Sequence, residues 1–296
     1  AEVGGVTAFS WLVGTLIAMA LGGAFARLAR QYPNLNSPDD YVRPALGRDM
    51  GFLATTLYWT SSWMGNNAIA VAAFGYLVIL LPIDDSGSVR LVGQIVLIWL
   101  MFALNLLGPR SIARFQSMCV IFGLLPVVAV LIAGWGSFDP GIYRESWNIT
   151  GKSDAVAVFN ELAPVFWAFV GLETGAMVAG VVRDPDRNVP IATIGGILIA
   201  GVVYLVSSVL MMGIVPAGQM AASSAPFALV AGQMFGPWAI PVIAAAAALK
   251  ATGTLGGWML VTGESGARAA QRGFLPSVFG RLRGNGSAGT GLFIIA

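Results

Sequence analysis

Long apolar stretches alternate with short polar ones along almost the whole chain. Each apolar stretch approaches the roughly 20 residues that an α-helix needs to cross a bilayer. Turn residues, such as Asn-Ser-Pro-Asp-Asp at 36–40, separate them. The alternation of apolar and polar stretches predicts a short surface helix at Pro226–Phe235, rather than a span. The pattern predicts membrane spans at about 6–25, 50–82, 91–107, 117–135, 156–181, 191–214 and 241–262, and another that begins near residue 289.

The arginine and lysine residues between these spans are unevenly distributed. Twelve of them lie in alternate loops, whereas the loops on the opposite side hold three. An excess of Lys and Arg marks the cytoplasmic side of a membrane protein, so the turn Arg-Asp-Pro-Asp-Arg at 183–187 is predicted to be cytoplasmic. The twelve are Arg27, Arg30, Arg43, Arg48, Arg110, Arg114, Arg183, Arg187, Arg268, Arg272, Arg281 and Arg283, and the three are Arg90, Arg144 and Lys152.

The composition points to the same solvent. Of the 296 residues, 57% are hydrophobic and 10% are charged, against about a quarter charged in a soluble domain. The chain has no histidine and one cysteine, Cys119, which excludes an internal disulfide and any histidine ligand or base. A net charge of +2 without a basic run gives no sign of nucleic-acid binding. We expect a multi-pass membrane protein that carries neither a cofactor nor a metal.

One carboxylate, Glu173, lies in the middle of the predicted span 156–181. A charge at that depth costs roughly 2.5 to 3.5 kcal/mol on insertion scales, so it rarely lacks a partner or a function. Pro164 and Gly171 precede it, and both residue types interrupt membrane helices where the freed backbone faces protein or a water-filled cavity. A broken helix with an acid near the midplane is typical of a transporter's binding site.

Three motifs carry a resemblance to a known family. They are Leu-Tyr-Trp-x-x-x-Trp-x-Gly-Asn at 57–66, Trp-x-Phe-x-Gly-x-Glu at 167–173 followed by Asp-Pro-Asp-Arg-Asn-Val-Pro-Ile-Ala-Thr-Ile-Gly-Gly at 184–196, and Leu-Gly-Gly-Trp at 255–258. In this order and spacing they resemble the amino acid–polyamine–organocation transporters, and among these the bacterial arginine:agmatine antiporters. The likeness runs along nearly the whole chain.

The resemblance implies an all-α integral protein of the bacterial inner membrane with the inverted-repeat (5+5) amino acid transporter fold. On that pattern the chain holds helices two to eight and the start of the ninth, as one transporter domain over residues 1–296. The first helix of the family carries a Gly-[Ser/Thr]-Gly segment that holds the substrate carboxylate, and no such segment occurs within residues 1–25, which contain the first predicted span. We therefore expect an interior fragment, truncated at both ends, whose site residues describe the parent protein.

The matched motifs also imply a set of substrate-binding residues. On the helix at 50–82, four of them fall within about 80° of one another at 100° per residue. The competing interpretation of Asn66 and of its neighbour Asn67 is ordinary hydrogen bonding between helices. Trp167 matches an aromatic that covers the substrate, where an indole face suits a cation. The substrate-binding set is Tyr58, Ser61, Ser62, Asn66, Ile69, Trp167, Ala168, Val170, Gly171 and Trp258.

Two charged residues are candidates for gating and proton coupling. Glu173 resembles the acid of the family's intracellular gate, and a structural hydrogen bond is its alternative. Lys250 departs from the family pattern, which has a small residue there. Sodium-coupled relatives bind a sodium ion in this region, and several sodium-independent members place a lysine ammonium at that site. Lys250 is therefore a candidate fixed cation, with snorkelling or an ion pair, for example to Glu173, as the alternative.

The resemblance implies secondary active transport by alternating access, with a cationic amino acid such as arginine exchanged for its decarboxylated amine. Ornithine/putrescine or lysine/cadaverine exchange stays open, and so does proton-coupled uptake of neutral or other amino acids, which Lys250 slightly favours. An enzyme would need a nucleophile–base pair or a metal set, and neither is visible. A structural subunit would not need Glu173, Lys250 and two adjacent asparagines. The expected partners are a small-molecule substrate and the lipid bilayer, and homodimer formation stays open.

Overall fold

A computed structural model of the chain describes residues 3–32, 37–81, 83, 86–174 and 184–296. These residues form helices joined by turns and loops, and no β-strand occurs among them. The chain divides into two compact units, each with a core of its own. The first unit contains residues 1–36 and 131–223, and the second contains residues 37–130 and 224–296.

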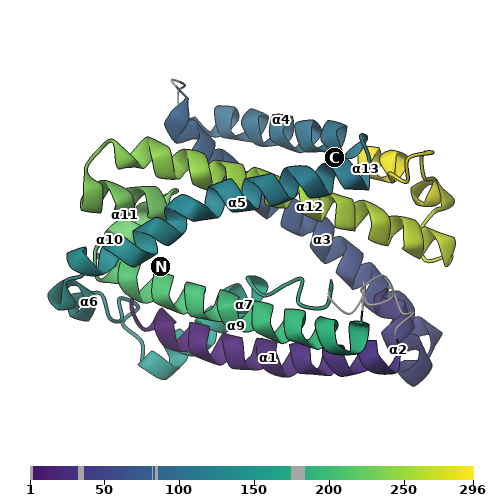
Figure 1. The fold of residues 1–296 in the computed structure, drawn as a ribbon, viewed down its shortest axis with the longest axis horizontal. Coiled ribbons are helices and arrows are strands. Elements are labelled where there is room, and N and C mark those ends of the chain that lie inside the picture. The colour runs from purple at the N-terminus through teal and green to yellow at the C-terminus, as the bar shows by residue number, and fades with distance from the viewer. Residues whose placement is uncertain (1–2, 33–36, 82, 84–85, 175–183) are drawn as a thin grey trace. The chain divides into compact units, whose positions relative to one another are not determined.

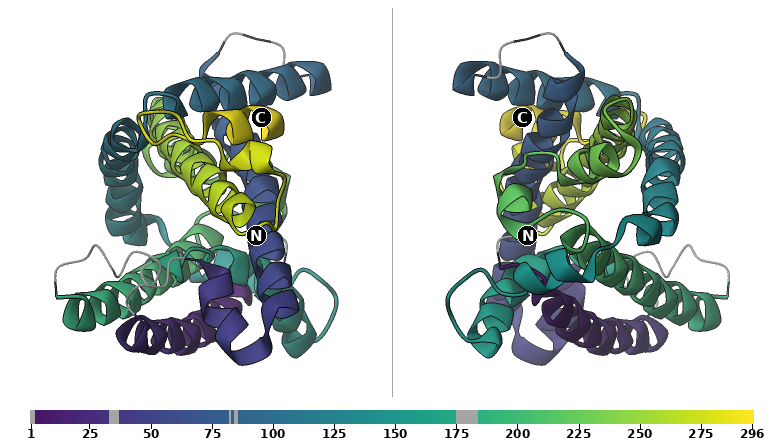
Figure 2. Two further views of the ribbon diagram at one scale, coloured as in Figure 1. Left: turned by 90° about the vertical axis from the view of Figure 1, so that its right-hand side faces the viewer. Right: turned by 90° about the vertical axis from the view of Figure 1, so that its left-hand side faces the viewer.

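The first unit is built on two long helices, α1 (Thr7–Gln31) and α9 (Pro185–Met212), which lie side by side (Figure 1; Figure 2). They run antiparallel, because Gly22 meets Ile197 while Thr15 meets Gly201. A Cβ atom at either glycine would overlap its neighbour, so the two backbones depend on small residues to approach closely. The shorter α7 (Asp154–Trp167) packs against α1. The core of this unit is formed by Ala18, Val165, Phe169 and Ile197.

The loop segments of the first unit include η2 (Gly134–Ser137), α6 (Pro140–Glu145) and α10 (Ala217–Ala222). The N–H groups of Gly5 and Val6 donate to the carbonyl oxygens of Ser146 and Trp147, each at 2.8 Å. These two bonds attach the start of α1 to the segment that follows α6, on the side predicted to be external.

Asp154 begins α7 and ties the same loop to it. Its carboxylate accepts hydrogen bonds from Nε1 of Trp147 at 2.9 Å and from Nδ2 of Asn148 at 2.7 Å. The bond from Trp147 first, and that from Asn148 second, lower the pKa of Asp154 below its usual value of 3.8, because both stabilise the charged form.

The second unit is organised around α12 (Ala239–Gln271), which packs against α3, α4, α11 and α13 (Figure 1). Alanine and glycine dominate the sequence of α12, which suits a membrane helix whose neighbours must approach closely. Nδ2 of Asn105 adds a cross-link, since it donates to the carbonyl oxygen of Gly256 at 3.2 Å. The other elements are α2 (Pro38–Leu46), α3 (Arg48–Leu77), η1 (Val78–Leu80), α4 (Gly87–Asn105), most of α5 (Pro109–Ala133), α11 (Pro226–Phe235), η4 (Ser277–Gly280) and α13 (Gly289–Ile295).

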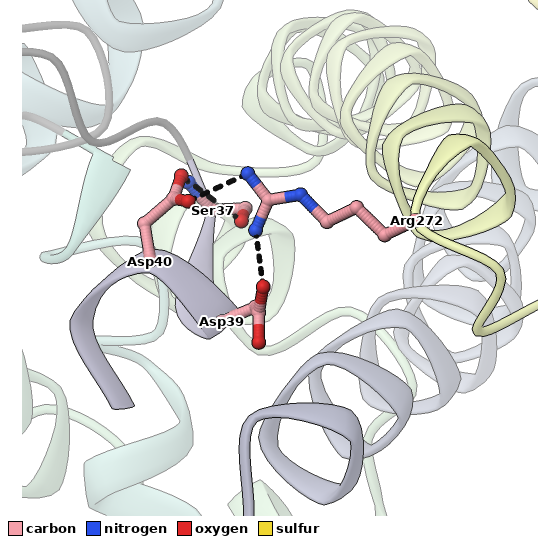
Figure 3. A network of polar contacts seen from close by, with 4 residues as sticks. All are labelled: Ser37, Asp39, Asp40 and Arg272. Atoms are coloured by element: carbon pink, nitrogen blue, oxygen red, sulfur yellow. Dashed lines mark hydrogen bonds and ion pairs between the residues drawn. The ribbon is translucent and has the colours of Figure 1, made fainter. Parts of the chain in front are cut away.

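A cluster of charges joins α2 to the end of α12 (Figure 3). Arg272 donates to Oδ2 of Asp39 and to Oδ1 of Asp40, each at 2.6 Å. Oδ2 of Asp40 also accepts from the backbone N–H and the hydroxyl of Ser37, which cap α2. A Cβ atom at Gly51 would overlap the carboxylate of Asp39, so the start of α3 leaves room for this pair. We call Ser37, Asp39, Asp40 and Arg272 the Arg272 clamp.

Six described helices are long and apolar enough to cross a membrane, and they confirm six of the predicted spans. The boundaries differ where the helices leave the apolar region. The fourth span begins at Pro109 instead of residue 117, and α12 continues to Gln271 instead of ending near residue 262. Hydropathy detects the part of a helix that lies in the bilayer and misses its polar ends. The predicted short helix at Pro226–Phe235 is α11, with the same bounds, although part of it is buried.

Candidate functional site

The first unit contains the predicted break. Helix α7 ends at Trp167, and a series of tight turns follows, in which the N–H groups of residues 169, 170, 172 and 174 each donate to the carbonyl three residues earlier. Gly171 has a φ of +107°, in the left-handed region that residues with a Cβ rarely adopt. This glycine therefore redirects the chain after α7. The part of the predicted span from 175 to 181 lies outside the described residues.

The polar groups of the break bond mostly to the break itself. Oε2 of Glu173 accepts the N–H of Gly171 at 3.1 Å, and the hydroxyl of Thr174 donates to the carbonyl oxygen of Gly171 at 2.6 Å. Oε1 of Glu173 is buried and has no hydrogen-bond partner among the described residues. The acid thus supports the turn at Gly171 with one oxygen and leaves the other as an acceptor.

Aromatic packing holds the break against its neighbours. The rings of Trp11 on α1 and Tyr204 on α9 lie 4.8 Å apart, and Phe169 packs on Tyr204 at 5.6 Å. The hydroxyl of Tyr204 also donates to the carbonyl oxygen of Ala168 at 3.4 Å. One predicted substrate-binding residue, Ala168, therefore has its backbone connected to α9. Trp11 also packs on Phe169, at 6.4 Å, so all three rings form one cluster.

A cavity of about 300 Å³ lies between the break and α9. Ala168 and Gly171 belong to its wall, and Gly196 on α9 leaves its opposite side open. The hydroxyl of Thr193 is buried in this wall without a partner among the described residues. Two further predicted residues of the break project away from the core, since Trp167 is 52% exposed and Val170 is 45% exposed.

In the second unit, the predicted residues of α3 divide between two sides of the helix. Ser62 and Asn66 are buried, Tyr58 and Ile69 are half-buried, and Ser61 is exposed. The hydroxyl of Ser62 donates within the helix, to the carbonyl oxygen of Tyr58 at 2.8 Å.

A chain of two hydrogen bonds connects Asn66 on α3 to Trp258 on α12. Nδ2 of Asn66 donates to Oγ1 of Thr262 at 3.1 Å, and the hydroxyl of Thr262 donates to the carbonyl oxygen of Trp258 at 2.8 Å. Thr262 is completely buried. The structure therefore brings together two residues that were predicted to bind substrate, through a third that was not predicted.

Lys250 lies on α12, two turns before Trp258. It is half-buried, and its Cβ atom packs against Gly123 of α5. Its ammonium group forms neither a hydrogen bond nor an ion pair within the described part of the chain. No group of three or more His, Cys, Asp or Glu side chains that could hold a metal ion occurs in the described part of the chain.

A family model of amino acid permeases matches residues 1–296, which is the entire chain. The chain belongs to the amino acid permease family. With six apolar helices of membrane-spanning length in its described part, this permease is a multi-pass protein of the cell membrane.

Several curated proteins are similar to this permease. It is 35% identical over 299 residues to the cadaverine/lysine antiporter of Escherichia coli K12, an alignment that covers 100% of the chain and 66% of that protein. It is 36% identical over 282 residues to the putrescine transporter PotE of the same strain, and this alignment covers 95% of the chain and 64% of that protein. It is 32% identical over 295 residues to a putrescine transporter PotE of Haemophilus influenzae, covering 100% and 68%. The chain thus spans about two thirds of the length of these relatives.

The relatives refine the resemblance drawn from the motifs. The superfamily is confirmed, whereas the names of these three proteins point to lysine, cadaverine and putrescine, and none contains arginine or agmatine.

Residues that the sequence reasoning missed in this permease are those that act through a contact with another helix. Thr262 and Tyr204 are examples, because each bonds to a predicted residue on a different element or turn. The available signal for Thr262 was its position one turn after Trp258, on the face of a helix rich in small residues. No comparable signal exists for Tyr204, which looks like an ordinary aromatic of an apolar span.

Proposed function

We propose that the full-length protein exchanges a cationic amino acid for its decarboxylated amine, with lysine and cadaverine as the preferred pair. The observation that carries this proposal is the similarity to the cadaverine/lysine antiporter, which extends over the whole chain. The two similar putrescine transporters favour a site for an aliphatic amine. Exchange of arginine for agmatine has no comparable support, and ornithine/putrescine exchange is the nearest variant.

The described residues offer the groups that such a substrate needs. The indole of Trp167 is exposed at the end of α7 and can cover a cation with its face. The backbone at Ala168, Val170 and Gly171 follows it and is not part of a continuous helix. Irregular backbone at membrane depth is tolerated where it lines a cavity, and in this family of folds that is where substrates bind.

The second unit carries the other residues that the motifs imply for substrate binding. Asn66 and Trp258 are joined through Thr262, and Tyr58, Ser62 and Ile69 lie on the same helix as Asn66. Ser61 is exposed on the adjacent face of α3, where it can meet polar groups of a ligand. We assign these residues to the side chain of the substrate.

Glu173 and Lys250 are the proposed gating and coupling groups. Glu173 holds the turn at Gly171 through one oxygen, so a change in its charge changes what holds the break together. Lys250 carries an ammonium that no described carboxylate neutralises, in a helix where a charge is costly. We propose that it takes the place of a coupling sodium ion.

Counterflow into proteoliposomes tests the function. Vesicles that contain the full-length protein are loaded with unlabelled cadaverine and diluted into labelled lysine, with and without sodium. We expect lysine to accumulate only when cadaverine, or another accepted amine, is inside, and to do so equally well without sodium. Accumulation that follows an imposed pH gradient without an internal amine would instead support proton-coupled uptake. That second candidate is favoured by Lys250, whose charge would repel a cationic substrate.

A further inference from the structure

The hydroxyl of Thr262 has a single proton, and the structure shows where it goes. Oγ1 lies 2.8 Å from the carbonyl oxygen of Trp258, which can only accept. The oxygen of Thr262 is therefore left as an acceptor toward α3. Asn66 must meet it with its NH₂ group, as the 3.1 Å contact from Nδ2 has it. The single proton of the Thr262 hydroxyl therefore determines the orientation of the Asn66 carboxamide.

The oxygen of this carboxamide, Oδ1, is available to accept a hydrogen bond. Oδ1 of Asn66 is buried, since the residue is only 6% exposed, and it has no donor among the described residues. A buried acceptor without a donor is costly, so it needs an explanation. A ligand that offers N–H groups and no acceptor would satisfy it, and a primary ammonium is such a group.

Asn105 shows that an unpartnered oxygen alone does not mark a site. Its Oδ1 is also buried without a described donor, but its Nδ2 donates to two backbone carbonyls, those of Met101 and Gly256. Its orientation is therefore set by the backbone of α4 and α12 in a sealed core. Asn66 differs because a side-chain hydroxyl sets its orientation, and the proton of that hydroxyl also holds the backbone of Trp258.

We propose that Thr262 is a positioning residue that makes Asn66 an acceptor and thereby selects substrates with a distal ammonium. The proposal rests on the function proposed above and specifies the chemistry that the site prefers. Removing the hydroxyl releases the carboxamide, which can then turn and present NH₂ to a ligand carbonyl. Loss of Thr262 should therefore change which ligands are preferred, and not simply weaken them all.

Two ligands of matched length separate these effects. Cadaverine ends in an ammonium, whereas 5-aminopentanamide ends in an amide that offers a carbonyl acceptor. The measurement is the inhibition of labelled lysine uptake by each compound, in proteoliposomes that contain the full-length protein. In Thr262→Val we expect the preference for cadaverine over the amide to fall about threefold to tenfold. The lower value corresponds to the free energy of a typical interhelical hydrogen bond, and the upper value corresponds to about 1.4 kcal/mol.

Three variants serve as controls. Thr262→Ser keeps the hydroxyl and should keep the preference of the wild type. Thr262→Ala removes the hydroxyl with a smaller side chain, and it carries the same expectation as Thr262→Val if the valine variant does not fold. Thr15→Val removes a matching bond, from Oγ1 to the carbonyl oxygen of Trp11 at 2.7 Å, in the first unit. It should leave the preference unchanged.

The outcomes separate this inference from the proposed function. Wild-type uptake of lysine with the same ligand preference in Thr262→Val and Thr262→Ala would overturn the role of Thr262 and leave the function standing. An equal loss for both ligands would do the same, because it indicates a structural role. Absence of lysine uptake in the wild type would overturn the proposed function and this inference with it.

Discussion

The break in the first unit and the α3–α12 contact in the second are held together in different ways. In the break, Glu173 and Thr174 bond to Gly171, two or three residues away. Phe169 packs on the rings of Trp11 and Tyr204, which belong to α1 and α9. Between α3 and α12, Asn66 bonds to a residue 196 positions away in the sequence. The Arg272 clamp spans 233 positions.

This difference indicates which region can change shape at low cost. Local hydrogen bonds can reform in another conformation of the same turn, and aromatic contacts tolerate sliding. Bonds between distant helices must break when the helices separate. We therefore expect the second unit to behave as a stiff support and the break to be the part that adapts to substrate.

The largest effect should come from the Arg272 clamp. Arg272→Ala leaves Asp39, whose side chain is 2% exposed, without its counter-charge. Breaking a fully buried pair costs 3 to 5 kcal/mol, and we expect roughly 2 to 3 kcal/mol here because the guanidinium side chain is 30% exposed. The measurement is thermal or denaturant unfolding of the full-length protein in detergent, at pH 7.

Glu264→Gln is the matched control for that experiment. Glu264 pairs with Arg268 one turn away on α12, where the side chains are 38% and 40% exposed. An exposed pair of this spacing contributes about 0.3 to 0.5 kcal/mol. Equal losses of stability in Arg272→Ala and Glu264→Gln would contradict the view that the clamp stiffens the second unit.

A middle-sized effect, on binding instead of stability, is expected at the break. Trp167→Leu removes an indole that is 52% exposed, so the unfolding transition should hardly move. Substrate affinity measured by calorimetry should fall by on the order of 1 to 2 kcal/mol if the ring covers a cation. Trp11→Leu should instead lower the unfolding temperature and leave substrate affinity nearly unchanged, since Trp11 packs on Tyr204 and Phe169. Unchanged affinity in Trp167→Leu would return this residue to a packing role.

The smallest effect concerns Asp154, at the start of α7. Hydrogen bonds from Trp147 and Asn148 lower its pKa, so the stability it adds is complete above its ordinary value of 3.8. That stability is lost as the pH falls through the lowered value. Wild type should therefore unfold at a higher temperature than Asp154→Asn at pH 7, and the two should converge in strong acid. A difference that persisted there would show that charge is not its cause.

Much of the fold could be predicted from the sequence, because a membrane imposes a simple length and polarity rule on each span. The six spanning helices, the short α11 and the break near Gly171 follow from that rule and from residue conformational preference. The polar ends of α5 and α12 could not be predicted from that rule, because hydropathy does not detect helical residues outside the apolar region. The Arg272 clamp also escaped prediction, since its carboxylates and its guanidinium look like ordinary loop charges.

The sequence predicts the candidate site only as a list of residues. Motifs identified Asn66 and Trp258, but a sequence does not show that Thr262 connects them, because their contact depends on the register between α3 and α12. Lys250 shows the same limit from the other side. Its charge is conspicuous in the sequence, whereas its packing against Gly123 of α5 follows only from the helix crossing.

The Arg272 clamp also sets an order in time for the newly made protein. Its two aspartates leave the ribosome 233 and 232 residues ahead of their arginine. At a synthesis rate of about 5 to 20 residues per second, that interval is roughly 12 to 47 seconds. During it, α2 carries two acids without their counter-charge while four described spans, α3, α4, α5 and α9, enter the bilayer. The second unit therefore closes late in biogenesis, and α12 is the helix whose arrival completes it.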